Sequence, residues 1–162
     1  MTRRIVVGMH HINVTQCQFC PNGLSHKYIP AVDLAGEDTG RDYWRAMDGA
    51  YKCIGTWGTA HGTAFAPIDS NGNYEMTELA DGTIRYLAIY LVHDNNAHKV
   101  GTVIPKGEVM YTEGSYANSK TGQVGNHIHC EAFVFDPNDI KLDRIQAQDD
   151  GLAWWLSSRR QW

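Results

Sequence analysis

Histidine and glutamate alternate with apolar residues near the end of the chain. His127, His129 and Glu131 lie in the segment GNHIHCEAFVF, which spans residues 125–135. Successive side chains of a β-strand point to opposite faces of the sheet, so a strand would place these three on one face. Neighbouring imidazoles would then stand about 6 to 7 Å apart, close enough to serve one metal centre. The alternative is a pair of surface histidines on a half-exposed strand.

Three residues elsewhere in the sequence could join this pair. Asp33 lies between two apolar residues, so on a strand it would face away from the core. A carboxylate in such surroundings is unusual unless a neighbouring group needs its charge. His26 precedes it in the same segment. His93 ends the most hydrophobic predicted strand, where it would point either into a cleft or into water.

Such a set of residues suits metal chemistry. A catalytic zinc ion takes three protein ligands and leaves a fourth position open for water. His26, Asp33 and His129 can supply those ligands. His93 and His127 would then act on the water, one accepting its proton and the other donating a hydrogen bond to the developing oxyanion. These residues predict metal-assisted hydrolysis of an amide bond, with Zn²⁺ as the cofactor.

The same residues resemble those of a known family, the lysostaphin-type (LytM-type) zinc metallopeptidases that cut peptidoglycan. The resemblance covers about residues 20–135 and is strongest to stand-alone phage and prophage endolysins. It implies a β-rich fold, the same three zinc ligands and the same two catalytic histidines. Its motifs are Gly-x-His-x-His-x-Glu at 125–131, the pair His26 and Asp33 ahead of Gly36, and the strand-end His93.

Glu131 and the cysteines leave alternatives open. Glu131 could orient an imidazole of the metal centre or form a salt bridge with a neighbouring strand. Cys17 and Cys20 form a Cys-x-x-Cys pair, for which a disulfide or two free thiols is favoured over a structural metal. A Cys-His hydrolase would need an activated thiolate. Cys53 and Cys130 stand in predicted strands beside core residues, which favours a packing role for both.

The elements that must position these residues are short and alternate in hydrophobicity, with almost no helical periodicity. This pattern predicts a mainly β fold with an antiparallel sheet core and long loops. Asn and Gly at 71–73 and Asp and Gly at 81–82 predict turns, because these residues tolerate positive φ. The segment 113–126 is too polar for core and is expected to be a surface loop. The predicted strands span residues 4–9, 48–57, 63–68, 83–92, 109–112 and 127–135.

The chain is expected to form one domain over residues 1–162. Its core is predicted at about 20–135, and residues 137–162 are expected to form a short C-terminal helical appendage that packs on the sheet. Twenty-six residues are too few for an independent domain. A chain of this length can bury enough surface to fold without a metal or disulfides, so a bound metal would serve function.

Charge and hydropathy exclude several functions. The net charge of −4 and the absence of long basic runs make nucleic acid a poor partner. The longest apolar run, residues 86–92, is too short to span a bilayer, which takes about 20 residues. The first residues lack the apolar core of a signal peptide. We therefore expect a monomer without membrane contacts that stays in the host cytoplasm until release and then acts on the cell wall.

These observations predict a zinc metalloendopeptidase that hydrolyses peptide bonds of bacterial peptidoglycan, an antimicrobial phage endolysin. Bacterial peptidoglycan, through its peptide stem or cross-bridge, is the predicted partner. The alternative is a zinc-binding but non-catalytic peptidoglycan-binding or assembly module on the same fold.

Overall fold

The computed structural model describes residues 2–5, 8–9, 13–17, 31–36, 43–57, 62–78, 82–94, 98–117 and 124–144. These residues form β-strands and turns but no helix, and none of them belongs to a helix that could span a membrane. The strands are β1 (Thr2–Arg3), β2 (Asn13–Cys17), β3 (Ala31–Ala35), β4 (Tyr43–Arg45), β5 (Ala50–Trp57), β6 (Gly62–Ile68), β7 (Met76–Glu78), β8 (Ile84–Arg85), β9 (Leu87–Val92), β10 (Val103–Ile104), β11 (Val109–Thr112), β12 (Gly114–Ala117), β13 (Val124–Asp136) and β14 (Asp139–Arg144).

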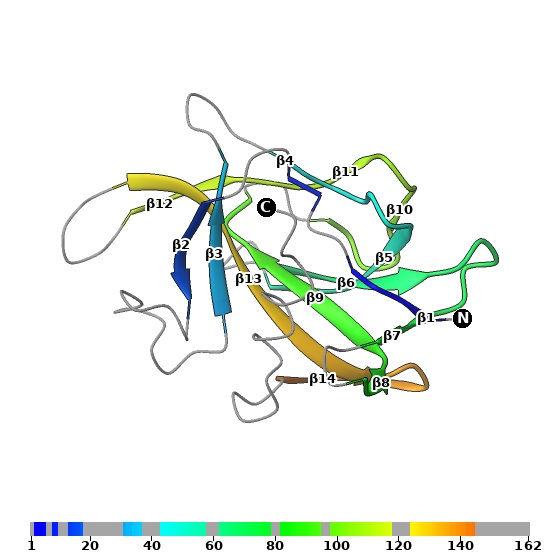
Figure 1. Cartoon of the computed structure of the whole chain (residues 1–162). Coiled ribbons are helices and arrows are strands. Elements are labelled where there is room, and N and C mark those ends of the chain that lie inside the picture. Colours follow the sequence, from blue (N-terminus) through cyan, green and yellow to red (C-terminus); the bar gives the residue numbers. More distant parts are fainter. Residues whose placement is uncertain are drawn as a thin grey trace.

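A nine-stranded sheet dominates the structure. Seven of its strands follow the order β10-β5-β6-β9-β13-β3-β2, and β12 and β14 pair with the two ends of β13 (Figure 1). Every pair within this sheet is antiparallel. Two smaller sheets, β1-β7-β8 and β11-β4, complete the described part, and only the short β1–β7 pair is parallel there. The prediction of a mainly β, antiparallel fold is confirmed.

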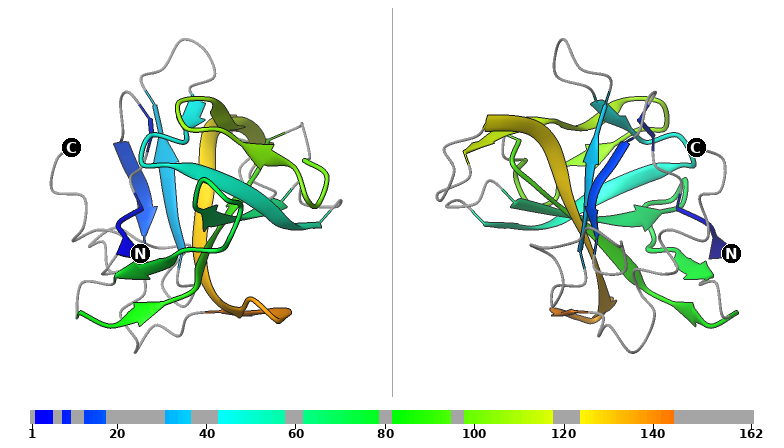
Figure 2. Two further views of the ribbon diagram at one scale, coloured as in Figure 1. Left: turned by 90° about the vertical axis from the view of Figure 1, so that its right-hand side faces the viewer. Right: turned by 60° about the vertical axis from the view of Figure 1, so that its left-hand side comes forward.

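The longest strand, β13, lies in the middle of the sheet and connects β9 to β3. It lies between β9 and β3, and it bends along its length from the end that pairs with β12 to the end that pairs with β14 (Figure 2). Over His129–Glu131 the strand has a neighbour on both sides, so its backbone groups are paired there. Its side chains are therefore held at defined positions on both faces of the sheet.

The two faces of the sheet have different partners. One face of β13 and β3 contributes alternate residues to the main hydrophobic core, as period-two alternation predicts. Among them are Val32, Leu34, Ile128, Cys130 and Ala132. A smaller apolar cluster contains Ile54, Ala64, Ala66, Ala88 and Phe135. Strand β6 is buried along its whole length because its residues serve both clusters.

Three predicted segments differ from the structure. Among residues 2–5 and 8–9, which the structure describes there, Thr2–Arg3 form a strand, whereas the sequence predicts one over 4–9. The polar segment 113–126, predicted as a loop, contributes Gly114–Ala117 to a strand, because its backbone pairs with β13 and needs no apolar side chains for that. Asp139–Arg144 form a strand against β13, where a helical appendage is predicted, and the rest of the appendage lies outside the described residues.

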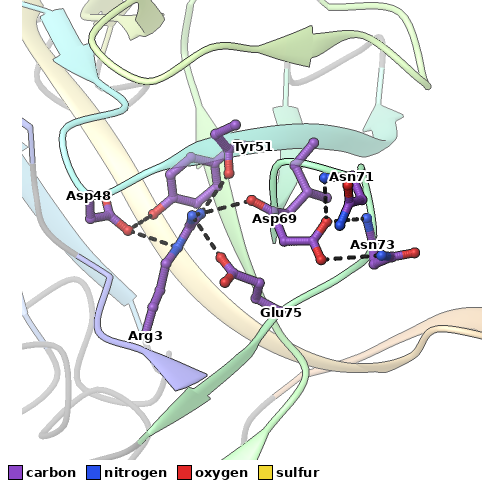
Figure 3. Close-up of polar contacts among 9 residues, drawn as sticks. Arg3, Asp48, Tyr51, Asp69, Asn71, Asn73 and Glu75 are labelled. Atoms are coloured by element: carbon purple, nitrogen blue, oxygen red, sulfur yellow. Dashed lines mark hydrogen bonds and ion pairs between the residues drawn. The ribbon is translucent and has the colours of Figure 1, made fainter. Parts of the chain in front are cut away.

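A cluster of contacts around Arg3 connects β1 to the start of β5 (Figure 3). The Arg3 guanidinium donates hydrogen bonds to the Glu75 carboxylate, at 3.0 Å, and to the Ala50 carbonyl, at 2.6 Å. Its Nε lies 3.2 Å from Asp48, which also accepts a hydrogen bond from the Tyr51 hydroxyl at 2.7 Å. The guanidinium stacks 4.6 Å from the centre of the Tyr51 ring. Hydrogen bonds, ion pairs and a cation–π contact therefore hold this short strand in place.

The predicted turn at residues 71–73 is confirmed. Asp69 Oδ1 accepts hydrogen bonds from the backbone N–H groups of Asn71 and Asn73, both at 2.8 Å (Figure 3). These hydrogen bonds to Asn73 and Asn71 lower the pKa of the Asp69 carboxyl, because they stabilise its charged form. Gly72 has φ +83°, a conformation that glycine adopts without strain.

Candidate functional site

The register of β13 brings the separated histidines and carboxylates together. His129 stands opposite Asp33 on β3 and opposite Val92 on β9. His93 follows Val92 directly, so it arrives next to the same position of β13. Residues that are 96 positions apart in the sequence thus become neighbours across one strand pair. The predicted face is confirmed, since the residues that alternate with them belong to the core.

His129 bridges two buried carboxylates. Its Nδ1 lies 3.0 Å from Asp33 Oδ1, and its Nε2 lies 3.0 Å from Glu131 Oε1. Asp33 and Glu131 are only 4% and 3% exposed, so water does little to screen either charge. When both ring nitrogens donate, the imidazole is positively charged. The triad is then one positive charge between two negative charges, and Glu131 orients an imidazole of its own strand.

Two further histidines lie beside this triad. His127 Nε2 is 3.7 Å from the second oxygen of Asp33, within reach of an ion pair if the ring is protonated. The rings of His93 and His127 meet edge to face, with centres 4.7 Å apart. His93 lies 6.0 Å from the ring centre of His129. Three imidazoles and two carboxylates therefore form one connected group, which we call the His–carboxylate cluster.

The two carboxylates change the acidity of His129. Burial by itself lowers the pKa of an imidazole, because it penalises the charged form. The hydrogen bonds to Asp33 and Glu131, and the negative charges of both, act in the opposite direction and are larger in sum. They raise the pKa of His129 to about 9. The imidazole of the metal-free protein is thus charged at neutral pH.

This raised pKa makes stability depend on pH. A histidine that binds its proton more tightly in the folded state stabilises that state fully below its unfolded pKa, and the contribution is lost as the pH rises through the folded pKa. We expect the free energy of unfolding of the metal-free protein to fall between about pH 6.5 and about pH 9. Urea unfolding across this range measures it. A His129→Gln control should show a flatter profile, and equal profiles would contradict the prediction.

Four of the five predicted site residues lie in this cluster: Asp33, His93, His127 and His129. The fifth, His26, lies outside the described residues, as do His10, His11 and His61. Within the described ranges, no group of three or more His, Cys, Asp or Glu side chains is placed to hold a metal ion. Cys53 and Cys130 are buried, and their predicted packing role is confirmed. Burial raises the pKa of the Cys53 thiol, which disfavours a reactive thiolate.

Two buried carboxylates lie close to the cluster, and the sequence alone does not predict their burial. Asp94 is 4% exposed and accepts a hydrogen bond from the Thr112 N–H at 2.9 Å. Glu113 is 3% exposed and accepts one from the Gly36 N–H at 2.6 Å. Both follow predicted strands directly, where a carboxylate is usually solvated. The only signal in the sequence was the adjacency of Asp94 to His93.

Comparison with known proteins yields one informative likeness. No family model matches the chain. The chain is 32% identical over 123 residues to "Morphogenesis protein 1" of Bacillus phage B103. The aligned part is 75% of this chain but 30% of the relative, so the chain spans less than a third of the relative's length.

These findings contradict the identification as a lysostaphin-type peptidase. The relative is named as a phage morphogenesis protein, and the described residues contain no three-ligand metal group. The predicted function of a peptidoglycan endopeptidase is contradicted with it, as are the descriptions endolysin and metallopeptidase; only the link to a phage agrees. The inference failed because residue types at matching spacing do not by themselves determine an activity. The alternative of an assembly module agrees better with the comparison.

Proposed function

We propose that this chain is a non-catalytic assembly module that takes part in building a phage particle. The observation that carries the proposal is the 32% identity to the phage morphogenesis protein over three quarters of this chain. Because the chain spans only 30% of that relative, the proposal concerns one module and not the relative's whole activity.

The cluster geometry supports a binding or structural role. Both ring nitrogens of His129 are engaged by carboxylates at 3.0 Å. A doubly donating imidazole has no lone pair with which to accept a proton from water. In the metal-free protein, His129 therefore links β3 to β13 through charge-assisted hydrogen bonds, which are stronger than neutral ones.

A replacement experiment tests the assembly proposal. The matching part of the Bacillus phage B103 protein is exchanged for this chain, and infectious particles are counted after infection with the chimeric phage. We expect the chimera to support assembly well above a phage that lacks the matching part. A soluble, folded chimera that gives no more particles than the deletion would contradict the proposal. Release of soluble peptides from purified cell walls by the isolated chain would overturn its non-catalytic part.

We also propose that the module binds one Zn²⁺ through Asp33 and His129, with His26 as the third ligand. Ligand atoms of a tetrahedral zinc site lie about 3.3 Å apart, given metal–ligand bonds of about 2.0 to 2.1 Å. The 3.0 Å between Asp33 Oδ1 and His129 Nδ1 fits this spacing. Glu131 on the other ring nitrogen is the partner that metal-bound histidines usually have. Bound zinc would take the place of the Asp33–His129 hydrogen bond, with loss of the Nδ1 proton, and would connect β3 to β13 in its stead.

The zinc content and the Tm of the purified chain test this proposal. We expect about one zinc per chain after dialysis, and a lower Tm after chelation, because a ligand that binds only the folded state stabilises it. Asp33→Asn should lose the metal, whereas Asp136→Asn, an exposed carboxylate at the end of β13, should keep it. A chain that holds no zinc, and whose Tm does not respond to added zinc, would contradict it.

Peptidoglycan remains a second predicted partner. We expect the purified chain to sediment together with insoluble cell walls and to stay in solution in buffer without walls. A chain that stays in solution in both cases would contradict this prediction. Size-exclusion chromatography with light scattering, on the purified chain before walls are added, tests whether it is a monomer.

A further inference from the structure

His93 has a backbone conformation that needs support from its surroundings. Its φ is +95°, and it is the only non-glycine residue with positive φ among those that the structure describes. L-residues with side chains rarely adopt this region, and such outliers persist where neighbouring structure imposes them. The residue is at the end of β9, and its ring contacts His127 and His129.

Asp94 fixes the chain directly after His93. Its carboxylate accepts a hydrogen bond from the Thr112 N–H at 2.9 Å, and its own N–H donates to the Tyr111 hydroxyl at 3.1 Å. The carboxylate is 4% exposed, and the Tyr111 side chain is fully buried. The main chain and the side chain of Asp94 are thus both attached to β11, so this end of β9 has little freedom to rotate.

Gly114 supports the other side of the same turn. A Cβ at Gly114 would overlap the carbonyl oxygen of His93, so only glycine lets β12 pass this close. The preceding residue, Glu113, accepts a hydrogen bond from the Gly36 N–H at the end of β3. One turn between β11 and β12 therefore contacts both the segment that carries His93 and the strand that carries Asp33.

We infer that Asp94 and Gly114 are positioning residues that fix the His93 imidazole against His127. The edge-to-face contact of the two rings, with centres 4.7 Å apart, is the geometry that they preserve. The inference rests on the proposed function only in taking the His–carboxylate cluster as the functional site. It assigns to Asp94 and Gly114 a role at the cluster through the backbone next to His93. Gly114 also stands opposite His127 where β12 pairs with β13.

NMR of the histidine side chains in the metal-free full chain tests this inference. A ring at this distance shifts the resonances of its neighbour, so His93→Ala should move the imidazole signals of His127 and define the size of the ring effect. We expect Asp94→Ala, which removes the acceptor of the Thr112 N–H, to produce at least half of that movement. Gly114→Ala should move the signals as well, but Gly114 also pairs with His127 across β12 and β13, so Asp94→Ala is the deciding variant. Amide signals of β5 and β6 should stay unchanged, which separates repositioning of one ring from general loss of structure.

Matched variants serve as controls. Arg4→Met and Asp136→Asn each remove an exposed charge that has no part in the His–carboxylate cluster. Both should leave the His127 signals in place. If Asp94→Ala does not fold, Tyr111→Phe decides, because it removes the hydroxyl that accepts from the Asp94 N–H. The inference is overturned if the folded variants keep the wild-type His127 signals, or if His93→Ala does not move them. Neither readout uses phage assembly or zinc, so failure of the proposed function would be recognised separately.

Discussion

Replacing Asp33 with alanine is expected to lower the free energy of unfolding by about 3 to 5 kcal/mol, the usual cost of breaking a buried ion pair. Asp33 is 4% exposed and is 3.0 Å from His129 Nδ1. Without it, the charged His129 loses a carboxylate partner in surroundings that water screens poorly. Denaturation by urea at neutral pH, without zinc, measures the loss.

A double-mutant cycle makes this prediction specific. His129→Ala is combined with Asp33→Ala, and the two single losses are compared with the combined loss. Groups in direct contact show coupling energies of about 0.5 to 3 kcal/mol, whereas independent sites add. We expect the double variant to be less destabilised than the sum. Because His129 loses its charge as the pH passes its pKa of about 9, the coupling should shrink in alkaline solution. Additive losses at neutral pH would show that the pair does not stabilise the fold.

Replacing Arg3 with methionine is expected to cost about 3 kcal/mol, although the residue is in a two-residue strand near the start of the chain. Its guanidinium is 12% exposed and lies against two carboxylates, Asp48 and Glu75, that are 6% and 12% exposed. Methionine keeps much of the apolar stem but leaves both charges without their cation. Asp48 retains the Tyr51 hydroxyl, so part of the cost is offset.

The neighbouring arginine provides the control. Arg4 is 70% exposed and is 3.6 Å from Glu78, itself 41% exposed. Exposed ion pairs contribute about 0 to 1 kcal/mol, because water screens the charges and ordering long side chains costs entropy. Arg4→Met should therefore have little effect in the same chemical denaturation assay. Equal losses for the two variants would mean that burial of the Arg3 cluster contributes nothing.

The assembly of the cluster shows where sequence reasoning stops. The alternation at 127–131 places two histidines and a glutamate on one face, and the apolar neighbours of Asp33 place its carboxylate away from the core. Both are properties of a few adjacent residues. That Asp33 lies opposite His129 follows from the β3–β13 register, which depends on pairing segments 96 positions apart. The positive φ of His93 likewise depends on β11 and β12.

The fold shows the same division. Turn residues and alternating hydrophobicity were enough to predict an antiparallel β structure. The strand Gly114–Ala117 has a polar composition typical of a loop, and it is a strand because its backbone pairs with β13. Asp139–Arg144 have partial helical spacing, yet the chain reverses at Asn138, whose N–H donates to Asp136, and pairs with β13. In both cases, long-range hydrogen bonding overrode local propensity.

By itself, then, the sequence determined which side chains share a face and where the chain turns, because strand periodicity and turn conformations are local preferences of consecutive residues. Only the tertiary structure decided which strands pair, which carboxylates lose contact with water, and which histidine becomes charged. These properties arise from free energies of burial and pairing between distant segments. For that reason Asp94 and Glu113, unremarkable as residues in the sequence, are buried partners in the folded protein, and the Arg3 side chain is only 12% exposed.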